Sequence, residues 1–152
     1  SREDSEIIEN IRNINAIPLS IDDSLKVEVE LEGVLYSPSS NSKIPIEQLL
    51  SNSITKIDKN TSLLFLAFQI FSSSSDELSD LTQLQNWGFD VPITLRTDDP
   101  RQVIRWHSQW IKKELFSNFP TNGIVAKCNS SLTKNILGVS ASSPNWALAL
   151  TR

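Results

Sequence analysis

The sequence predicts an α/β fold: a single three-layer domain over residues 1–152 with a central, mostly parallel sheet. Nearly unbroken apolar residues in SLLFLAFQIF (62–71) are typical of a strand that is covered on both faces. Strand and helix patterns then alternate across residues 62–128, at spacings that suit right-handed crossovers between parallel strands. The chain has no methionine, even at its first position, which fits a fragment of a larger protein or a processed product.

An N-terminal helix and an acidic edge strand are predicted to precede this core. Isoleucines recur at helical intervals in residues 3–16, and the helix is expected to end before Pro18. In LKVEVELEGVLY (25–36), apolar residues alternate with three glutamates, which indicates a strand with one packed face and one solvent face. Glutamates along one face also disfavour pairing with another chain, as at the edge of a sheet. Residues 44–54 predict a short helix with Pro45 in its first turn.

The remaining elements have boundary signals of their own. A helix after the serine run SSSS is predicted because leucines stand at positions 78, 81 and 84 and Gly88 can end it. The patterns further predict strands over 90–96 and 123–128, a helix from Asp99 to about Phe116, and a last strand over 144–150. The segment NILGVS (135–140) competes with 144–150 for the role of last strand.

The predicted helix that begins at Asp99 contains two of the four tryptophans, the only histidine and several basic residues. Asp99 suits the N-cap, Pro100 the first helical position, and Gln102 the third position of a capping box. On a helical wheel the apolar arc contains Val103, Ile104, His107, Trp110, Ile111 and Leu115. His107 lies near the centre of this arc, so we expect it to be packed and hydrogen-bonded to backbone or water. Trp106 lies at the border of the arc and is expected to cover the rim of the core.

Polar segments leave the three predicted core strands, and parallel strands would bring them to one edge of the sheet. These segments are Ser72–Ser75, Thr97–Asp99 and Cys128–Ser131. Ligands of open α/β sheets bind in the crevice beyond the carboxyl ends of the strands. The candidate ligand-binding residues are therefore Ser74, Thr97, Asp98 and Asn129. Their side chains suit a phosphate, a carboxylate or a hard cation, although caps and turns alone require the same residue types.

The net charge of −4 conceals an asymmetry between the two parts of the chain. Residues 1–90 contain six basic and 15 acidic residues, whereas residues 91–152 contain eight basic and three acidic residues. Such a split arises when two parts of one fold attract each other, or when one surface binds an anionic partner. The candidate basic surface is the outer ridge of the helix, formed by Arg101, Arg105 and Lys112.

The sequence lacks the motifs that are typical of several classes of enzyme and binding protein. The sequence has no P-loop, no dinucleotide glycine fingerprint and no G-x-S-x-G, and none of its four glycines pair at short spacing. One histidine and one cysteine do not form a recognised zinc site, and nothing in the sequence joins Cys128 to His107 as nucleophile and base. The sequence therefore predicts no catalytic residue, no metal and no cofactor. A lone cysteine and the lack of a long apolar run favour the cytoplasm or another reducing intracellular compartment, with no membrane partner.

Three hypotheses for the function remain. The first is a non-catalytic α/β protein-interaction module within a larger protein or complex, whose partner is another protein or the rest of a larger chain. The second is a small-molecule or phosphate-binding domain, a sensor or a hydrolase, that uses the strand-end crevice. The third is nucleic-acid binding through the basic helix 101–113. The missing catalytic motifs favour the first.

Overall fold

The computed structural model describes residues 17–21, 28–36, 64–71, 73–118, 121–141 and 143–152. The chain separates into two compact units. The first unit comprises Ser1–Ser72 and Leu81–Pro92, and the second comprises Ser73–Asp80 and Ile93–Arg152. The single domain expected over residues 1–152 stays a prediction.

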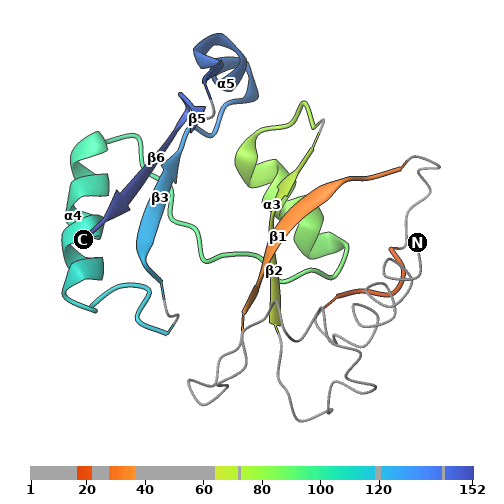
Figure 1. Ribbon diagram of the computed structural model, residues 1–152, viewed down its shortest axis with the longest axis horizontal. Helices are drawn as coiled ribbons and strands as arrows, with labels where there is room; N and C mark the ends of the chain where they lie inside the picture. Colours follow the sequence, from red (N-terminus) through yellow and green to blue (C-terminus); the bar gives the residue numbers. More distant parts are fainter. Residues whose placement is uncertain (1–16, 22–27, 37–63, 72, 119–120, 142) are drawn as a thin grey trace. The chain divides into compact units, whose positions relative to one another are not determined.

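The first unit contains an antiparallel pair of strands, β1 (Leu31–Tyr36) and β2 (Leu64–Ile70) (Figure 1). The expected alternation is confirmed in the described part of residues 25–36, where Val29 and Leu31 are half-buried and all three glutamates are exposed. A β-bulge interrupts the register between Glu32 and Gly33. Gly33 is required there because a Cβ atom would lie 2.6 Å from the carbonyl oxygen of Leu66 and against the Phe65 ring.

The core of the first unit forms between β2 and the second half of helix α3 (Glu77–Asn86). Among the described residues of this unit, the buried side chains are Ala67, Leu81, Leu84 and Phe89. The rings of Phe65 and Phe89 meet edge to face, with their centroids 6.1 Å apart. Gly88 follows the helix with a φ of 89°, a left-handed conformation that glycine adopts without strain. The predicted leucine spacing and glycine stop of this helix are thus confirmed.

The second unit is built on a different antiparallel pair, β3 (Gly123–Lys127) and β6 (Ala147–Thr151). Gly123 pairs with Thr151 at one end of this sheet, and Lys127 pairs with Ala147 at the other. The segment between the two strands contains helix α5 (Ser131–Leu137) and a small hairpin of β4 (Val139–Ser140) and β5 (Ser143–Pro144). The Ser130 side chain caps α5 by accepting a hydrogen bond from the Thr133 N–H.

Helix α4 (Pro100–Ile111) packs beside the β3–β6 sheet (Figure 1). Trp110 is the buried residue of this helix, with 4% of its surface exposed, and its indole N–H donates to the Thr121 hydroxyl at 2.8 Å. His107 stacks on Trp110, and its Nε2 atom lies 2.9 Å from the carbonyl oxygen of Thr151. The expectation that His107 is hydrogen-bonded to backbone is confirmed.

The predicted central, mostly parallel sheet is wrong. The described strands form short antiparallel pairs, namely β1 with β2, β3 with β6 and β4 with β5. The expected strand over 90–96 is reduced to one isolated bridge, in which Asp90 pairs in parallel with Leu66. A run of apolar residues reports that a strand is covered, but it carries no information on the direction of the neighbouring strand, and this is why the inference failed.

The start of helix α4 was predicted correctly and its end was not. Asp99 is the N-cap, because its carboxylate accepts from the Arg101 N–H at 2.9 Å, and Pro100 occupies the first turn. Gln102 does not complete a capping box, since its side-chain oxygen accepts from Arg105 instead. The helix ends at Ile111 rather than near Phe116, and Lys113 adopts a positive φ of 62° immediately after it.

The helices predicted over residues 3–16 and 44–54 lie outside the described residues. The last strand is confirmed as β6, and Asn135–Leu137 of the competing segment belongs to α5. None of the helices in the described part of the chain is both long enough and apolar enough to span a bilayer.

Candidate functional site

In the described part of the chain, the contacts of the predicted crevice residues are with other residues rather than with one another. Asn129 lies at the start of α3, where its side-chain oxygen accepts from the Leu78 N–H at 3.0 Å and its backbone oxygen accepts from the Glu77 N–H at 2.9 Å. Ser74 is exposed in the segment before α3. Thr97 and Asp98 have local contacts, to the backbone of Asp99 and to Arg96 respectively. A shared ligand site for the four residues stays a prediction, without the parallel strands that motivated it.

The N-termini of α3 and α5 cap each other. The Asp76 carboxylate accepts from the Ser131 N–H at 2.9 Å, while Asn129 satisfies the Leu78 N–H in return. The first N–H groups of a helix have no acceptor within that helix. Asp76, which precedes α3, supplies an acceptor to α5, and Asn129, which precedes α5, supplies an acceptor to α3. This exchange fixes the first turn of α3 against the loop that follows β3.

Next to this junction, two lysines converge on one glutamate. Lys127 Nζ lies 2.6 Å from one carboxylate oxygen of Glu77, and Lys134 Nζ contacts the other oxygen. All three side chains are mostly covered, with 15–23% of their surface exposed. Lys134 Nζ also lies 4.9 Å from the ring centroid of Trp146, at a distance suited to a cation–π interaction. We call Glu77, Lys127, Lys134 and Trp146 the lysine cluster.

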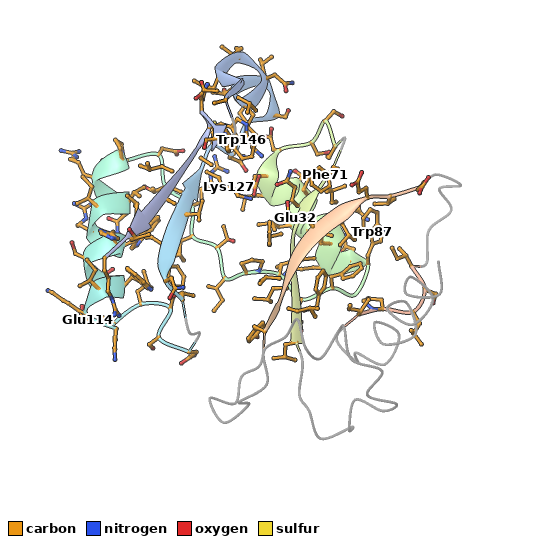
Figure 2. All side chains as sticks on the ribbon, in the orientation of Figure 1. Glu32, Phe71, Trp87, Glu114, Lys127 and Trp146 are labelled. Atoms are coloured by element: carbon orange, nitrogen blue, oxygen red, sulfur yellow. The ribbon has the colours of Figure 1, made fainter. Side chains whose placement is uncertain are left out.

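Neighbouring elements of the second unit supply every member of the lysine cluster. Lys127 is the last residue of β3, Lys134 lies in α5, and Trp146 directly precedes β6. The carbonyl oxygen of Trp146 accepts from the Cys128 N–H at 2.8 Å, which extends the β3–β6 ladder and holds the indole near the end of β3. Figure 2 shows Lys127 and Trp146 at this end of the sheet.

The sequence interpretation did not single out the lysine cluster. One signal was present, because Lys127 interrupts the otherwise apolar strand GIVAK and a charged residue at a covered strand position needs a partner. That partner, Glu77, lies 50 residues away in the chain, so no spacing rule connects the two.

The electrostatics of the lysine cluster suit an anion. Two ammonium groups and one carboxylate give the cluster a formal charge of +1, and limited exposure reduces the screening of that charge by water. The first unit contains a hollow of about 410 Å³ lined by Glu28, Val29, Glu30 and Phe71. Its two carboxylates disfavour an anion, so the lysine cluster is the stronger candidate for a phosphate-containing ligand.

The predicted basic surface is exposed but partly neutralised. Arg101 Nε lies 3.0 Å from the Asp99 carboxylate, and a guanidinium nitrogen of Arg105 lies 3.6 Å from it. The hydrogen bond from the Arg101 side chain, together with that from its backbone N–H, lowers the pKa of Asp99 below its ordinary value. Asp99 therefore stays ionised near neutral pH and offsets one of the two arginine charges. Lys112 is exposed at the end of α4.

Cys128 and His107 do not form a nucleophile–base pair. Cys128 follows β3 at its Lys127 end, where its sulfur lies 4.0 Å from the carbonyl oxygen of Ser130. His107 contacts Thr151, which pairs with Gly123 at the opposite end of β3. Gly123 and Cys128 are five positions apart along the extended chain, a separation of about 16 Å. Within the described residues, no group of three or more His, Cys, Asp or Glu side chains could hold a metal ion.

Residues 49–151 of the chain match the family described as the NAD-dependent DNA ligase adenylation domain. The DNA ligase of Mycoplasma genitalium is 26% identical over 161 residues, which cover 95% of this chain and 24% of that protein. The DNA ligases of Petrotoga mobilis and Pseudothermotoga lettingae are each 26% identical over 167 residues and likewise match 95% of the chain. The chain thus spans about a quarter of the length of these curated relatives.

This match overturns the hypothesis of a non-catalytic protein-interaction module, because adenylation is a chemical reaction and the matched residues are more than half of the chain. It covers β2, every described helix and both strands that frame the lysine cluster. The chain belongs to the family of NAD-dependent DNA ligase adenylation domains.

Proposed function

We propose that this chain acts as part of the adenylation domain of an NAD-dependent DNA ligase. The observation that carries the proposal is the family match over residues 49–151. Adenylation with NAD as donor breaks the pyrophosphate linkage of NAD and moves its adenylyl group to an acceptor. A protein that assists this reaction must bind the two phosphates and stabilise the negative charge that develops on the leaving phosphate.

The positive charges of the lysine cluster suit the negatively charged pyrophosphate of NAD. The two phosphates of NAD carry two negative charges, and Lys127 and Lys134 offer two ammonium groups within reach of one carboxylate, and therefore within reach of one small anion. Lysine binds phosphate as a compact point charge. In this proposal Lys127 and Lys134 contact the pyrophosphate, and Trp146 holds the Lys134 ammonium in place. NAD, when bound, supplies the activated adenylyl group.

Binding of NAD by the purified chain tests this assignment. We expect NAD to raise the melting temperature, with a stabilisation of about 2.7 kcal/mol at a hundredfold excess over the dissociation constant. Lys127→Ala should remove most of the shift, because the substitution deletes one of two ammonium groups that face the phosphates. Lys112→Ala is the matched control, since it removes the same charge from an exposed position of the same unit and should leave the shift intact. An equal shift in both variants would exclude Lys127 from the site.

DNA is the second proposed partner, and its position on the chain is inferred from the basic surface of Arg101, Arg105 and Lys112. Because Asp99 already pairs with both arginines, we expect a weak contribution to DNA affinity. The DNA-binding constant falls as the salt concentration rises, and a plot of its logarithm against the logarithm of the salt concentration is a line. Replacing all three residues with alanine should make the slope of this line shallower, by at most about 0.9 for each phosphate that the protein no longer neutralises. Binding of nicked duplex DNA measured across a salt series checks this, and an unchanged slope places DNA elsewhere.

A further inference from the structure

Glu77 occupies the position that an anion needs in the lysine cluster. One of its carboxylate oxygens accepts from Lys127 at 2.6 Å, and the other accepts from Lys134. A phosphate group that contacts both ammonium groups would need the same place. We propose that Glu77 is a built-in competitor, an internal counter-ion that the phosphates of a ligand must displace from Lys127 and Lys134. The identity of that ligand as NAD rests on the proposed function.

The backbone of Glu77 is held in place, so displacement must involve its side chain alone. The Glu77 N–H donates to Asn129 at 2.9 Å, and the next N–H, that of Leu78, donates to the Asn129 side chain. Asp76 accepts from Ser131 on the other side. These bonds hold the first turn of α3 against the same loop that connects the two lysines. A rotation about the side-chain bonds of Glu77 removes its carboxylate from both ammonium groups without unfolding that turn.

The competition also selects among anions. When a singly charged anion replaces Glu77, the two lysines exchange one single negative charge for another. The gain in binding free energy is small, because the displaced Glu77 carboxylate still needs a new partner. An anion with two or more charges gains from both lysines at once, since each ammonium group can face its own negative charge. We therefore expect the lysine cluster to prefer a pyrophosphate group over a monoanion.

Titration calorimetry with inorganic pyrophosphate and with NAD tests the competition directly. Glu77→Gln removes the negative charge and keeps the shape, so both ligands should bind about tenfold more tightly, equivalent to about 1.4 kcal/mol. Glu114→Gln is the control, because it makes the same change of net charge in the same unit at an exposed position beyond the end of α4. It should leave both affinities nearly unchanged, since distant exposed charges are screened. Equal or weaker binding by Glu77→Gln overturns the inference.

Cross-linking of the unaltered chain tests the same inference without a substitution, so its result does not depend on whether the Glu77→Gln variant folds. A carbodiimide joins carboxylates to amines that are already in contact, so free protein should yield Glu77–Lys127 and Glu77–Lys134 cross-links in a peptide digest. Both should decline as pyrophosphate is added, and sodium chloride at matched ionic strength should have a much smaller effect. Cross-links that persist at saturating pyrophosphate show that the anion binds without displacing Glu77 and overturn the inference.

The outcomes separate this inference from the proposed function. If pyrophosphate binds more tightly to Glu77→Gln while NAD binds to neither protein, the competitor role stands and NAD is not the ligand. If NAD binds but the Glu77→Gln affinity is unchanged, the proposed function stands and the competitor role fails. If pyrophosphate binds to neither protein, the lysine cluster is not an anion site and the inference fails.

Discussion

Replacing Leu84 with alanine is expected to lower the free energy of unfolding by about 2–5 kcal/mol. Leu84 has no exposed surface and lies in the core of the first unit with Ala67 and Phe89. The substitution removes three buried carbon atoms and leaves a cavity that the surrounding side chains fill only in part. Urea denaturation followed by circular dichroism measures the change as a shift of the midpoint at constant slope.

Gln85→Ala is the matched control for Leu84→Ala. Gln85 is the next residue of α3, and its side chain is exposed. Glutamine and alanine both favour helices, so this change should alter the free energy of unfolding by less than about 0.5 kcal/mol. If the two substitutions lower the free energy of unfolding equally, Leu84 does not pack in the core of the first unit.

Replacing Trp110 with alanine is expected to cost about 3–5 kcal/mol in the second unit. Trp110 is 4% exposed, and its ring stacks on His107 and lies 5.4 Å from the Arg152 guanidinium. No other large apolar residue in the described part of this unit is fully buried, so the loss falls on the centre of a small core. Thermal and urea denaturation followed by circular dichroism measure it.

Trp110→Phe separates the contribution of the ring from that of its hydrogen bond. Phenylalanine retains most of the packing but cannot donate to the Thr121 hydroxyl, which lies 2.8 Å from the indole nitrogen. Because Thr121 is exposed and can bond to water instead, the loss should be about 1 kcal/mol beyond the smaller ring volume. A loss as large as that of Trp110→Ala would mean that the hydrogen bond, rather than packing, stabilises this position.

The start of α4 and the end of α3 were predictable because their causes are local. Asp99 caps α4 through the N–H of a residue two positions away, and Gly88 ends the α3 segment with a conformation that its own backbone permits. Such contacts depend on residues within one turn of the chain, and the order of residue types is sufficient to indicate them. The end of α4 lacks such a signal, and there the prediction ran about one turn too far.

The lysine cluster illustrates what could not be predicted. Lys127 and Lys134 lie seven residues apart, but the carboxylate that joins them is 50 residues from the first and 57 from the second. Their meeting depends on the junction at which Asp76 and Asn129 cap opposite helices. If the lysine cluster binds phosphate as proposed, the same fact explains why the missing glycine motifs misled the functional interpretation, since a phosphate site made from side chains of distant elements leaves no short motif.

The sequence by itself determined the strands β1, β2, β3 and β6, the helices α3 and α4, where α4 begins and α3 ends, and that His107 is bonded to backbone or water. Only the tertiary structure decided that the strands pair antiparallel and that Glu77 lies between two lysines. The physical reason is the range of the interactions. The cap of α4 and the periodicity of helices and strands involve neighbours along the chain, whereas strand direction, ion pairing and the mutual capping of α3 and α5 depend on the path by which distant segments return to one another.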